Sequence, residues 1–586
     1  MQLLFHNTSP QPDWERKTWA SLDGEWGFCF DDADEGIRLG YPDTGHKLGG
    51  HITVPYAYQC AKSRVGDTAI HPVVWYKRSF KAEKWMREGR TFICFGAVDY
   101  ACDIWINGIH IGGHKGGYIG FKFEITSFVK DGDTEVTLRV VDMPDPAQSR
   151  GKQYWKETPS RCWYVASTGI WQTVWLESVS GIAMEYAHFT PDIDNASVGI
   201  ELLLEEFAHG LALEMEISYQ GRVVLSQKTT LSEQLSTLSV ALPDADYIDE
   251  IHYWSPENPN LYDVALTLTK DGVQQDAVNT YFGMRKIAVE DGKLTLNNRP
   301  LYLKMILDQG YWKDGDLTPP TPESFYDDIN AVKRMGFNGI RKHQKIEDRR
   351  FYYWADKLGV LVWGELPSAY RYGLPEIENL TSGMLSFVRR DYNHPSIIAW
   401  VPLNESWGVR KMRDSKRQQN FGKALYALLK SVDPTRLVST NDGWENVQTD
   451  IISIHDYSSD LRGSGLDFLN IADYKNHYPM GRRLFSSGTN PQDIPDAALM
   501  VTEYGGAALC KDTGNGAWGY AEGAADASEL AKTYEKQTKA IMKAAHIQGF
   551  CYTQLTDVHQ EVNGLLDSGH NFKVDPGEIA RINGRR

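Results

Sequence analysis

The spacing of apolar residues changes near residue 286, and this change constrains the fold more than any other feature of the sequence. Before it, short runs rich in aromatic and β-branched residues are separated by Gly, Asp and Pro, which is the pattern of β-strands joined by tight turns. After it, short apolar runs alternate with amphipathic stretches of about 12 or more residues, which is the βαβ pattern. One chain therefore combines an all-β part with an α/β part.

The all-β part divides into two stretches. Residues 1–180 include DIWINGIHIGG, in which Asn107-Gly108 between two apolar runs predicts a two-residue hairpin. We expect this stretch to form a jelly-roll-like β-sandwich. Residues 181–285 alternate more cleanly over about 100 residues, and their length and strand density predict an immunoglobulin-like β-sandwich. No Cys pair bridges this second stretch, so the prediction depends on size and pattern alone.

Residues 286–586 predict a (β/α)8 barrel, since eight strands in about 300 residues fit a closed barrel. We expect strands at 301–308, 339–343, 360–366, 397–404, 437–442, 451–457, 498–504 and 549–556. We expect helices at 322–335, 347–358, 382–393, 414–431 and 527–546. An open doubly wound sheet is the alternative, but no Gly-rich dinucleotide loop follows any early strand.

Composition narrows the range of partners. The net charge of −16 repels phosphate backbones and anionic lipid, so neither nucleic acid nor a membrane surface is an expected partner. The start of the chain lacks a signal-peptide pattern and no long apolar stretch occurs, which predicts a cytoplasmic protein. The odd number of cysteines, seven, agrees with buried reduced thiols. The 18 Trp residues suit sugar stacking as well as core packing. The sequence leaves open whether the protein forms a homo-oligomer.

Polar residues gather at the carboxyl ends of the expected barrel strands, where the active residues of such barrels lie. They are Asp308-Gln309, His343, Glu365, Asn404-Glu405, Asp442, His455 to Tyr457, Glu503 and Thr556-Asp557, with Trp312, Trp363, Trp407 and Trp444 nearby. No catalytic-metal spacing, P-loop or nucleophile elbow occurs, so we expect no metal and no cofactor.

Two facing carboxylates beside aromatic rings are what glycosidic cleavage needs, one protonated and the other ionised. Glu405 and Glu503 end the expected strands 4 and 7, which lie roughly across the barrel from each other. Position alone leaves Glu365 and Asp442 as rival candidates, and it also allows each glutamate to be a solvated cap or a salt-bridge partner.

Several segments resemble glycoside hydrolase family 2, in an order that spans the chain. In the first domain they are LDGEW, VPYAYQ, WYKRSF, FGAVDYACDIWINGIHIGGHKGGYIGF and GIWQTVWLE. FGMRKI is similar to the linker that enters the family's barrel. In the barrel, WVPLNESWG, MVTEYGG and GFCYTQLTDVHQEVNGLLD resemble the acid/base segment, the nucleophile segment and the last strand with its loop.

The resemblance implies roles for five residues. Glu405 would be the acid/base and Glu503 the nucleophile of a retaining exo-β-glycosidase. Asn404 would hydrogen-bond the sugar 2-OH, Tyr457 would orient the nucleophile, and His343 would contact the sugar. Glu405 would then have to be kept protonated by its surroundings while Glu503 stays ionised.

Four further residues are expected at the pocket with alternatives left open. Asp308 and Gln309 either line the pocket or form a turn, and Trp444 or Trp363 either stacks on substrate or packs in the core.

The sugar is predicted to be neutral, with a β-galactosidase-like specificity first. Glucuronidases of the family carry an Asn-x-Lys element in the last loop for the sugar carboxylate, whereas Asn563 stands at the Lys position here. Preference for a glucuronide would require Lys342, Arg371 or Lys573 to reach the pocket. β-Glucuronidase, β-mannosidase and β-arabinopyranosidase types are the alternatives, followed by a carbohydrate-binding protein that has lost catalysis.

Overall fold

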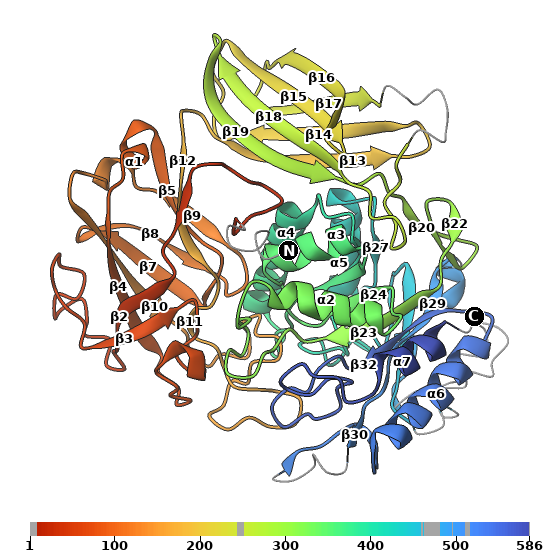
Figure 1. Ribbon diagram of the computed structural model, residues 1–586. Helices are drawn as coiled ribbons and strands as arrows, with labels where there is room; N and C mark the ends of the chain where they lie inside the picture. The colour runs from red at the N-terminus through yellow and green to blue at the C-terminus, as the bar shows by residue number, and fades with distance from the viewer. Residues whose placement is uncertain are drawn as a thin grey trace.

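The structure is a computed structural model that describes residues 9–242, 251–458, 461, 481–494, 496–509 and 516–584. Figure 1 shows an N-terminal β-sandwich, a second sandwich above it and a barrel surrounded by helices. The expected combination of two β-sandwiches with an α/β barrel is confirmed. No helix in the described ranges is both long and apolar enough to span a membrane.

The N-terminal sandwich packs two main sheets against each other. Its elements are β1 (Trp19–Ser21), β2 (Gly24–Phe30), β3 (Gly50–Val54), β4 (Val73–Lys81), α1 (Trp85–Glu88), β5 (Arg90–Phe95), β6 (Val98–Asp99), β7 (Ala101–Ile106), β8 (Ile109–Lys115), β9 (Phe121–Glu124), β10 (Asp133–Val141), β11 (Gly169–Ile170) and β12 (Val174–Val179). One sheet has the order β3-β2-β4-β10-β7-β8 and the other β1-β12-β5-β9. Asn107 and Gly108 both have positive φ, as the predicted hairpin between β7 and β8 requires.

The second sandwich has seven strands, which agrees with an immunoglobulin-like fold. They are β13 (Met184–Asp192), β14 (Ser197–Leu204), β15 (Leu211–Tyr219), β16 (Arg222–Thr230), β17 (Leu235–Ala241), β18 (Tyr262–Lys270) and β19 (Val273–Phe282). The sheets β13-β14-β17 and β16-β15-β18-β19 enclose one apolar core. Arg16 ties the two sandwiches together, since its guanidinium contacts Glu177 at 3.0 Å and Asp276 at 2.8 Å.

A parallel sheet of eight strands forms the barrel, in the order β27-β26-β25-β24-β23-β32-β29-β28. The strands are β23 (Leu303–Asp308), β24 (Gly339–Lys342), β25 (Leu361–Glu365), β26 (Ile397–Val401), β27 (Leu437–Val438), β28 (Ile451–Asp456), β29 (Ala498–Gly505) and β32 (Ile547–Thr553). A small sheet of β20 (Ile287–Glu290), β21 (Lys293–Leu296) and β22 (Arg299–Pro300) precedes it, and β30 (Ala507–Leu509) pairs with β31 (Ala521–Ala524).

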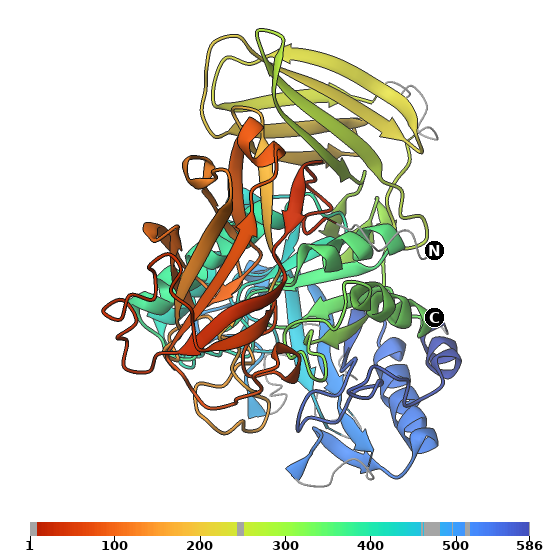
Figure 2. The same cartoon turned by 60° about the vertical axis from the view of Figure 1, so that its left-hand side comes forward.

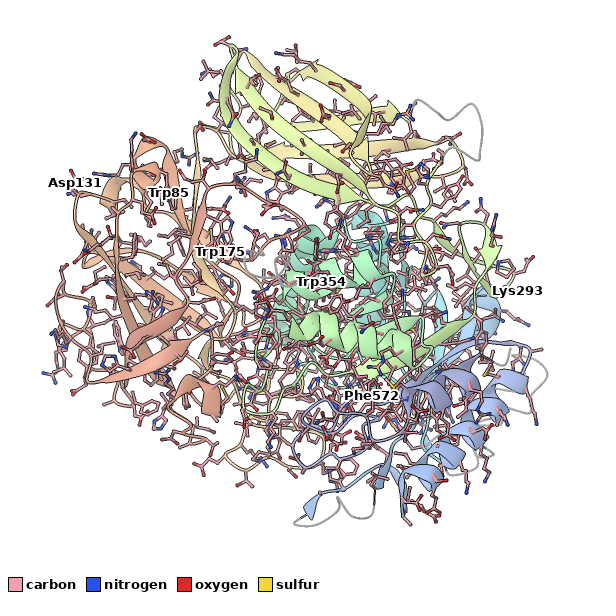
Figure 3. All side chains as sticks on the ribbon, viewed as in Figure 1. Trp85, Asp131, Trp175, Lys293, Trp354 and Phe572 are labelled. Carbon is pink, nitrogen blue, oxygen red and sulfur yellow. The ribbon has the colours of Figure 1, made fainter. Side chains whose placement is uncertain are left out.

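Helices cover the outside of the barrel. They are α2 (Ser324–Arg334), α3 (Arg349–Leu358), α4 (Leu374–Asp391), α5 (Lys416–Val432), α6 (Ala527–Lys543) and α7 (Pro576–Asn583). Tyr326 of α2 meets Trp354 of α3 edge to face at 5.2 Å, and Trp354 is labelled in Figure 3. Helix α4 begins eight residues before the expected start at 382, because Pro375 lies in its first turn, a favoured place for proline.

A long loop of the N-terminal sandwich reaches the barrel. Residues 142–168, between β10 and β11, form this loop, which we call the insertion loop. The amides of Arg150 and Gly151 both donate to the carbonyl of Ser368, just after β25, at 3.0 Å. Figure 2 shows the N-terminal sandwich in front of the barrel. The first domain therefore contributes residues to the mouth of the barrel.

Candidate active site

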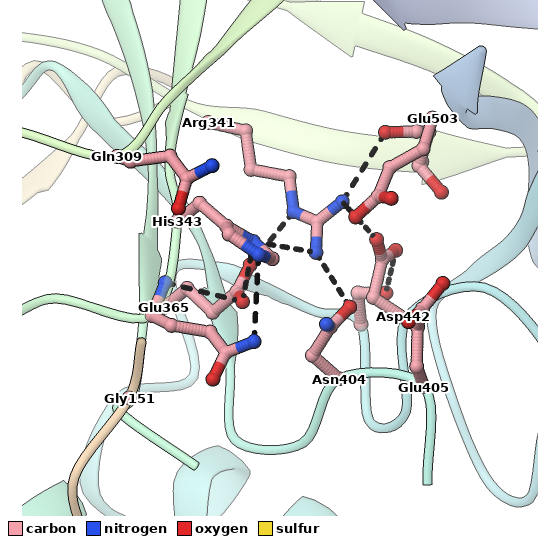
Figure 4. Close-up of polar contacts among 12 residues, drawn as sticks. Gly151, Gln309, Arg341, His343, Glu365, Asn404, Glu405, Asp442 and Glu503 are labelled. Carbon is pink, nitrogen blue, oxygen red and sulfur yellow. Dashed lines mark hydrogen bonds and ion pairs between the residues drawn. The ribbon is translucent and has the colours of Figure 1, made fainter. Parts of the chain in front are cut away.

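Arg341 on β24 is the centre of the polar cluster at the barrel mouth (Figure 4). Its guanidinium is fully buried and lies 2.7 Å from Glu365, 2.8 Å from Glu503 and 2.6 Å from Asp442. It also donates to the amide oxygen of Asn404 at 2.8 Å. One cation thus fixes four acceptors that come from four different strands or strand ends. Surrounding charge keeps the guanidinium ionised despite its burial.

His455 on β28 links the two glutamates expected at the site. Its Nδ1 lies 2.8 Å from Glu405 and 3.4 Å from Glu503, and its Nε2 lies 2.9 Å from Asp442. Burial opposes a charge on the ring, but Glu503, Asp442 and Glu405 raise the pKa of His455 to about 10. The ring is therefore an imidazolium at neutral pH.

Glu503 on β29 is held from two sides. Arg341 approaches one carboxylate oxygen, and the hydroxyl of Tyr457 donates to the other at 2.5 Å. Tyr457 is itself stacked on Tyr520, with ring centroids 4.2 Å apart. One oxygen of Glu503, one oxygen of Glu405 and one ring nitrogen of His455 all lie within 4.8 Å of one another. The two carboxylates therefore face each other at close range.

Glu405 occupies an unusual backbone conformation directly after β26. Its φ is 50° and that of Ser406 is 56°, a left-handed region that costs non-glycine residues of the order of 1–3 kcal/mol. The segment is held there because the amide of Glu405 donates to the Asp442 carbonyl and the amide of Ser406 to the Asn441 side chain, both at 2.9 Å. Backbone strain of this kind is concentrated at functional sites.

The protonation expected for Glu405 needs a correction. Burial raises the pKa of Glu405, but the hydrogen bond and charge of His455, followed by the charges of Lys152 and Arg341, lower it below its ordinary value. The resting site therefore holds an ionised Glu405 paired with a protonated His455. The implied mechanism alone predicts a protonated Glu405, whereas the contact with His455, from another strand, sets its charge in the resting site.

Exposure separates the rival carboxylates from the expected pair. The side chains of Glu365 and Asp442 are fully buried behind Arg341, whereas Glu405 is 18% exposed and Glu503 6% exposed. Burial also raises the pKa of Glu365 to about 7. Only Glu405 and Glu503 of these four can therefore touch a bound molecule.

Four other expected residues lie at the cluster. Asn404 and His343 contact Arg341, and the Nδ1 of His343 lies 3.0 Å from Glu365. Burial and the nearby cations Lys152 and Arg341 hold the pKa of His343 far below its ordinary value, so its ring is neutral. The amide of Gln309 is buried. Trp444 is partly exposed and meets His455 edge to face at 5.6 Å.

Asp308 and Trp363 do not lie where a bound sugar could reach them. Asp308 follows the inward-facing Leu307, so its side chain points out of the barrel and lies 2.7 Å from Lys342. Trp363 points inward but one layer below Glu365, and it is fully buried in the apolar core of the barrel. Asp308 therefore belongs to an ion-pair cluster and Trp363 to the core.

Arg341 and Lys152 were not among the expected residues, and His455 was expected at the strand ends but without a role. Arg341 and His455 each stand two positions before a residue with an expected role, His343 and Tyr457, on the same strand or strand end, and alternate residues of a strand share a face. That period is a signal that could have identified both. Lys152 belongs to the insertion loop, and no pattern in the barrel sequence points to it.

The group of Glu405, His455 and Glu503 has the spacing that a metal ion would need. Its chemistry does not fit one at neutral pH. Both ring nitrogens of His455 face carboxylates, and a protonated imidazole offers no lone pair to a metal. The arrangement favours a network of ion pairs.

Paired carboxylates at the mouth of a (β/α)8 barrel, preceded by two β-sandwiches, define the architecture of a multidomain glycoside hydrolase. The chain matches the sugar-binding domain of glycosyl hydrolases family 2 over residues 19–176, the family's central domain over 182–285 and its TIM barrel domain over 287–515. The chain belongs to glycoside hydrolase family 2.

Individual relatives carry different names. A β-galactosidase from Leuconostoc mesenteroides is 26% identical over 485 residues, which covers 74% of this chain and 43% of that protein. The chain thus spans less than half of that relative. A β-galacturonidase from Eisenbergiella tayi has a similar fold, with a TM-score of 0.74 at 18% identity over 98% of this chain and 97% of its own. A β-glucuronidase from Ruminococcus gnavus also has a similar fold, with a TM-score of 0.77 at 16% identity. The match covers 97% of this chain and 98% of that protein.

Proposed function

We propose that the chain is a retaining exo-β-glycosidase in which Glu503 is the nucleophile and Glu405 the acid/base. One observation carries the proposal: a carboxylate oxygen of each glutamate lies within 4.8 Å of the other. Retaining enzymes need about 5–5.5 Å between the two carboxyl groups, whereas inverting enzymes need about 6.5–9.5 Å to admit a water molecule.

The first step forms a covalent glycosyl ester. The Glu503 carboxylate attacks the anomeric carbon while the bond to the glycosidic oxygen breaks, and that oxygen leaves as an alcohol with a proton from Glu405. Glu405 and His455 share a hydrogen bond of 2.8 Å, so the proton stored on His455 can pass to Glu405 when the glycosidic oxygen approaches. Tyr457 and Arg341 hold the nucleophile in place.

The second step releases the sugar. Ester formation removes the charge of Glu503, and Glu405 then takes a proton from water as the water attacks the anomeric carbon. The bond to Glu503 breaks and its carboxylate is restored. Asn404 is suited to the sugar 2-OH because Arg341 occupies its amide oxygen and leaves the NH2 group to donate. Neutral His343 and partly exposed Trp444 are further proposed sugar contacts.

The proposed substrate is a neutral β-hexoside, with β-D-galactoside first. The three cations that the sequence offers for a sugar carboxylate all have carboxylate partners. Lys342 lies 2.7 Å from Asp308, Lys573 lies 2.6 Å from Asp557, and the exposed Arg371 pairs with Asp145 at 2.6 Å. A sugar carboxylate would also meet the negative field of Glu405 and Glu503.

A β-uronide is the second candidate, and Lys152 is the observation that favours it. Its ammonium is buried near Glu405 and Glu503. The Eisenbergiella tayi and Ruminococcus gnavus enzymes, which are similar in fold, are named as acting on uronides. β-Mannosides and β-arabinopyranosides could use the same two glutamates, and they belong in the same substrate panel.

Azide rescue tests the mechanism. Glu405→Ala should hydrolyse substrates with poor leaving groups far more slowly than activated aryl glycosides, because protonation matters least for a good leaving group. Added azide should restore turnover and yield the β-glycosyl azide. An α-azide product would mean that the mechanism is not retaining.

A substrate comparison tests the sugar. We expect kcat/KM for p-nitrophenyl β-galactoside to exceed that for the β-glucuronide, the β-galacturonide and the other neutral glycosides under the same conditions. A tenfold or larger preference for a uronide would refute the neutral assignment. Absence of hydrolysis for every glycoside would leave carbohydrate binding without catalysis as the better description.

A further inference from the structure

Lys152 enters the site because the insertion loop is pressed onto the barrel next to His343. The amide of Gly151 donates to Ser368, and the Tyr370 hydroxyl donates to the Gly151 carbonyl. Gly151 has a φ of 59°, and a Cβ at this position would collide with the carbonyl oxygen of Gln344, the residue after His343. Figure 4 places Gly151 beside the His343 and Glu365 side of the cluster. The side chain that follows therefore starts beside His343 and Glu365.

The ammonium of Lys152 lacks a direct partner in the part of the chain that the structure describes. Lys152 is 7% exposed, and among the described residues no hydrogen bond or ion pair involves its Nζ. An ammonium has three donors, and burying it without acceptors is costly. Lys342 provides the contrast, since its buried ammonium lies 2.7 Å from Asp308 and 3.0 Å from Glu347. A buried cation left with free donors beside the two glutamates is arranged to receive an acceptor from outside the chain.

Carboxylates surround Lys152 without touching it. Burial lowers the pKa of its ammonium, but Cys162 and Glu561, followed by Glu503 and Glu405, raise it above its ordinary value. The ammonium therefore stays charged, and it faces three carboxylates. A fourth carboxylate, from a uronide, would gain one attraction and meet three repulsions.

Glu561 is held in place by the same loop. It is fully buried, and it accepts a hydrogen bond from Tyr164 at 2.7 Å. The backbone amide of Tyr164 in turn donates to the carbonyl of Lys152 at 2.8 Å. Tyr164 also accepts from Gln309 at 2.7 Å, which ties this corner to the end of β23. Glu561 is thus held as the counter-charge of Lys152 and is itself shielded from a bound sugar.

We propose that Lys152 is a specificity-determining residue that donates a hydrogen bond to one hydroxyl of a neutral sugar, with Glu561 as the positioning counter-charge. The proposal depends on the proposed function. A hydroxyl oxygen satisfies the free donors of the ammonium without adding charge. In this arrangement the first domain selects the sugar, while the barrel supplies the carboxylates that cleave it.

Lys152→Met tests the contact, because methionine keeps the length of the side chain and removes the charge. We expect kcat/KM for p-nitrophenyl β-galactoside to fall about 100-fold, as for the loss of a charged hydrogen bond. We expect the melting temperature to fall less than in Lys342→Met, because Lys152 makes no direct ion pair and only its longer-range attraction to Glu561 is lost. Lys342→Met is the matched control, and its melting temperature should fall further because Asp308 loses a direct ion-pair partner and Glu347 keeps only Lys345.

Substrates that lack one hydroxyl, at C3, C4 or C6, locate the contact. The wild type should discriminate strongly against one of them, and Lys152→Met should not discriminate at that position. Glu561→Gln should raise the ratio of kcat/KM for the β-glucuronide to that for the β-galactoside, because the cation loses its counter-charge.

Three results would overturn the proposal while leaving the proposed function intact. They are unchanged galactoside kinetics in Lys152→Met, a loss confined to the glucuronide, or a fall in melting temperature as large as that of Lys342→Met. A wild type that hydrolyses no glycoside would contradict the proposed function and this proposal together.

Discussion

Replacing His455 with asparagine removes the imidazolium between the two glutamates while keeping an amide donor of similar position. In the wild type this ring lies 2.8 Å from Glu405 and 2.9 Å from Asp442, and it is fully buried. Its carboxylate neighbours hold its pKa at about 10, compared with 6.5 for an ordinary histidine. The variant should therefore change how stability depends on pH as well as stability itself.

The sign and the size of this pH dependence follow from the difference between the pKa values of His455 in the folded and unfolded states. Because the folded state raises the pKa of His455, its contribution to the free energy of unfolding is fully present below about pH 6.5 and is lost as the pH rises through about 10. At about 1.4 kcal/mol per pKa unit, this contribution is about 5 kcal/mol. The free energy of unfolding of the wild type should fall by up to that amount between about pH 6.5 and about pH 10. The free energy of unfolding of His455→Asn should fall by correspondingly less over the same range.

Urea unfolding at several pH values between 6.5 and 10 measures the effect. His394, whose pKa Asp356 and Asp13 raise to about 9 despite its burial, titrates in the same window, but it is present in both proteins. His343→Asn is the matched control. The pKa of His343 is far below its ordinary value, so this ring is neutral throughout the window. Its loss should not change the slope above about pH 8, where its neighbour Glu365, with a pKa of about 7, is already ionised. Equal slopes for the wild type and His455→Asn would refute the reasoning.

Three further predictions concern single side chains. Glu503→Gln should fold normally and lose about 10⁴-fold in kcat, or roughly 5.5 kcal/mol of barrier, and near-wild-type turnover in steady-state kinetics would argue against its role. Tyr457→Phe removes the 2.5 Å hydrogen bond to Glu503 and should lower kcat roughly 100-fold with little change in KM. A raised KM with an unchanged kcat would indicate a role in substrate binding alone. Gly151→Ala should lower both kcat/KM and the melting temperature, because its Cβ collides with the Gln344 carbonyl; unchanged values would mean that the insertion loop moves freely.

Much of the site could be predicted from strand ends. Two rules place Glu405, Glu503, Asn404 and Tyr457 at one mouth: parallel strands alternate with helices, and polar residues at their carboxyl ends gather there. The choice of these four over rivals such as Glu365 and Asp442 came from the resemblance to glycoside hydrolase family 2. Both rules act along the sequence, so they can be applied without coordinates. The second β-sandwich and the Asn107-Gly108 hairpin were predictable for the same reason, since each depends on local periodicity and turn chemistry.

Other features depend on contacts that no local pattern encodes. The charge state of Glu405 is set by His455 from another strand, and the pocket cation Lys152 comes from a loop of another domain. Asp308 and Trp363 were expected at the barrel mouth because both are near strand ends. The side chain of Asp308 points out of the barrel instead, and that of Trp363 lies too deep in the barrel to reach the mouth. The charge of Glu405 and the source of Lys152 are settled by which segments meet in space, whereas Asp308 and Trp363 depend on the direction and depth of a side chain within one strand.

The central claim, a retaining mechanism with Glu503 as the nucleophile, has a direct test in covalent trapping. A 2-deoxy-2-fluoro-β-galactoside with a good leaving group should accumulate as a glycosyl ester, because the fluorine slows its hydrolysis. Mass spectrometry of the digested protein should find one added sugar on the peptide that contains MVTEYGG, with the label on Glu503 and no label in Glu503→Gln. A label on another carboxylate, or rapid cleavage of substrate with no covalent intermediate, would contradict the account.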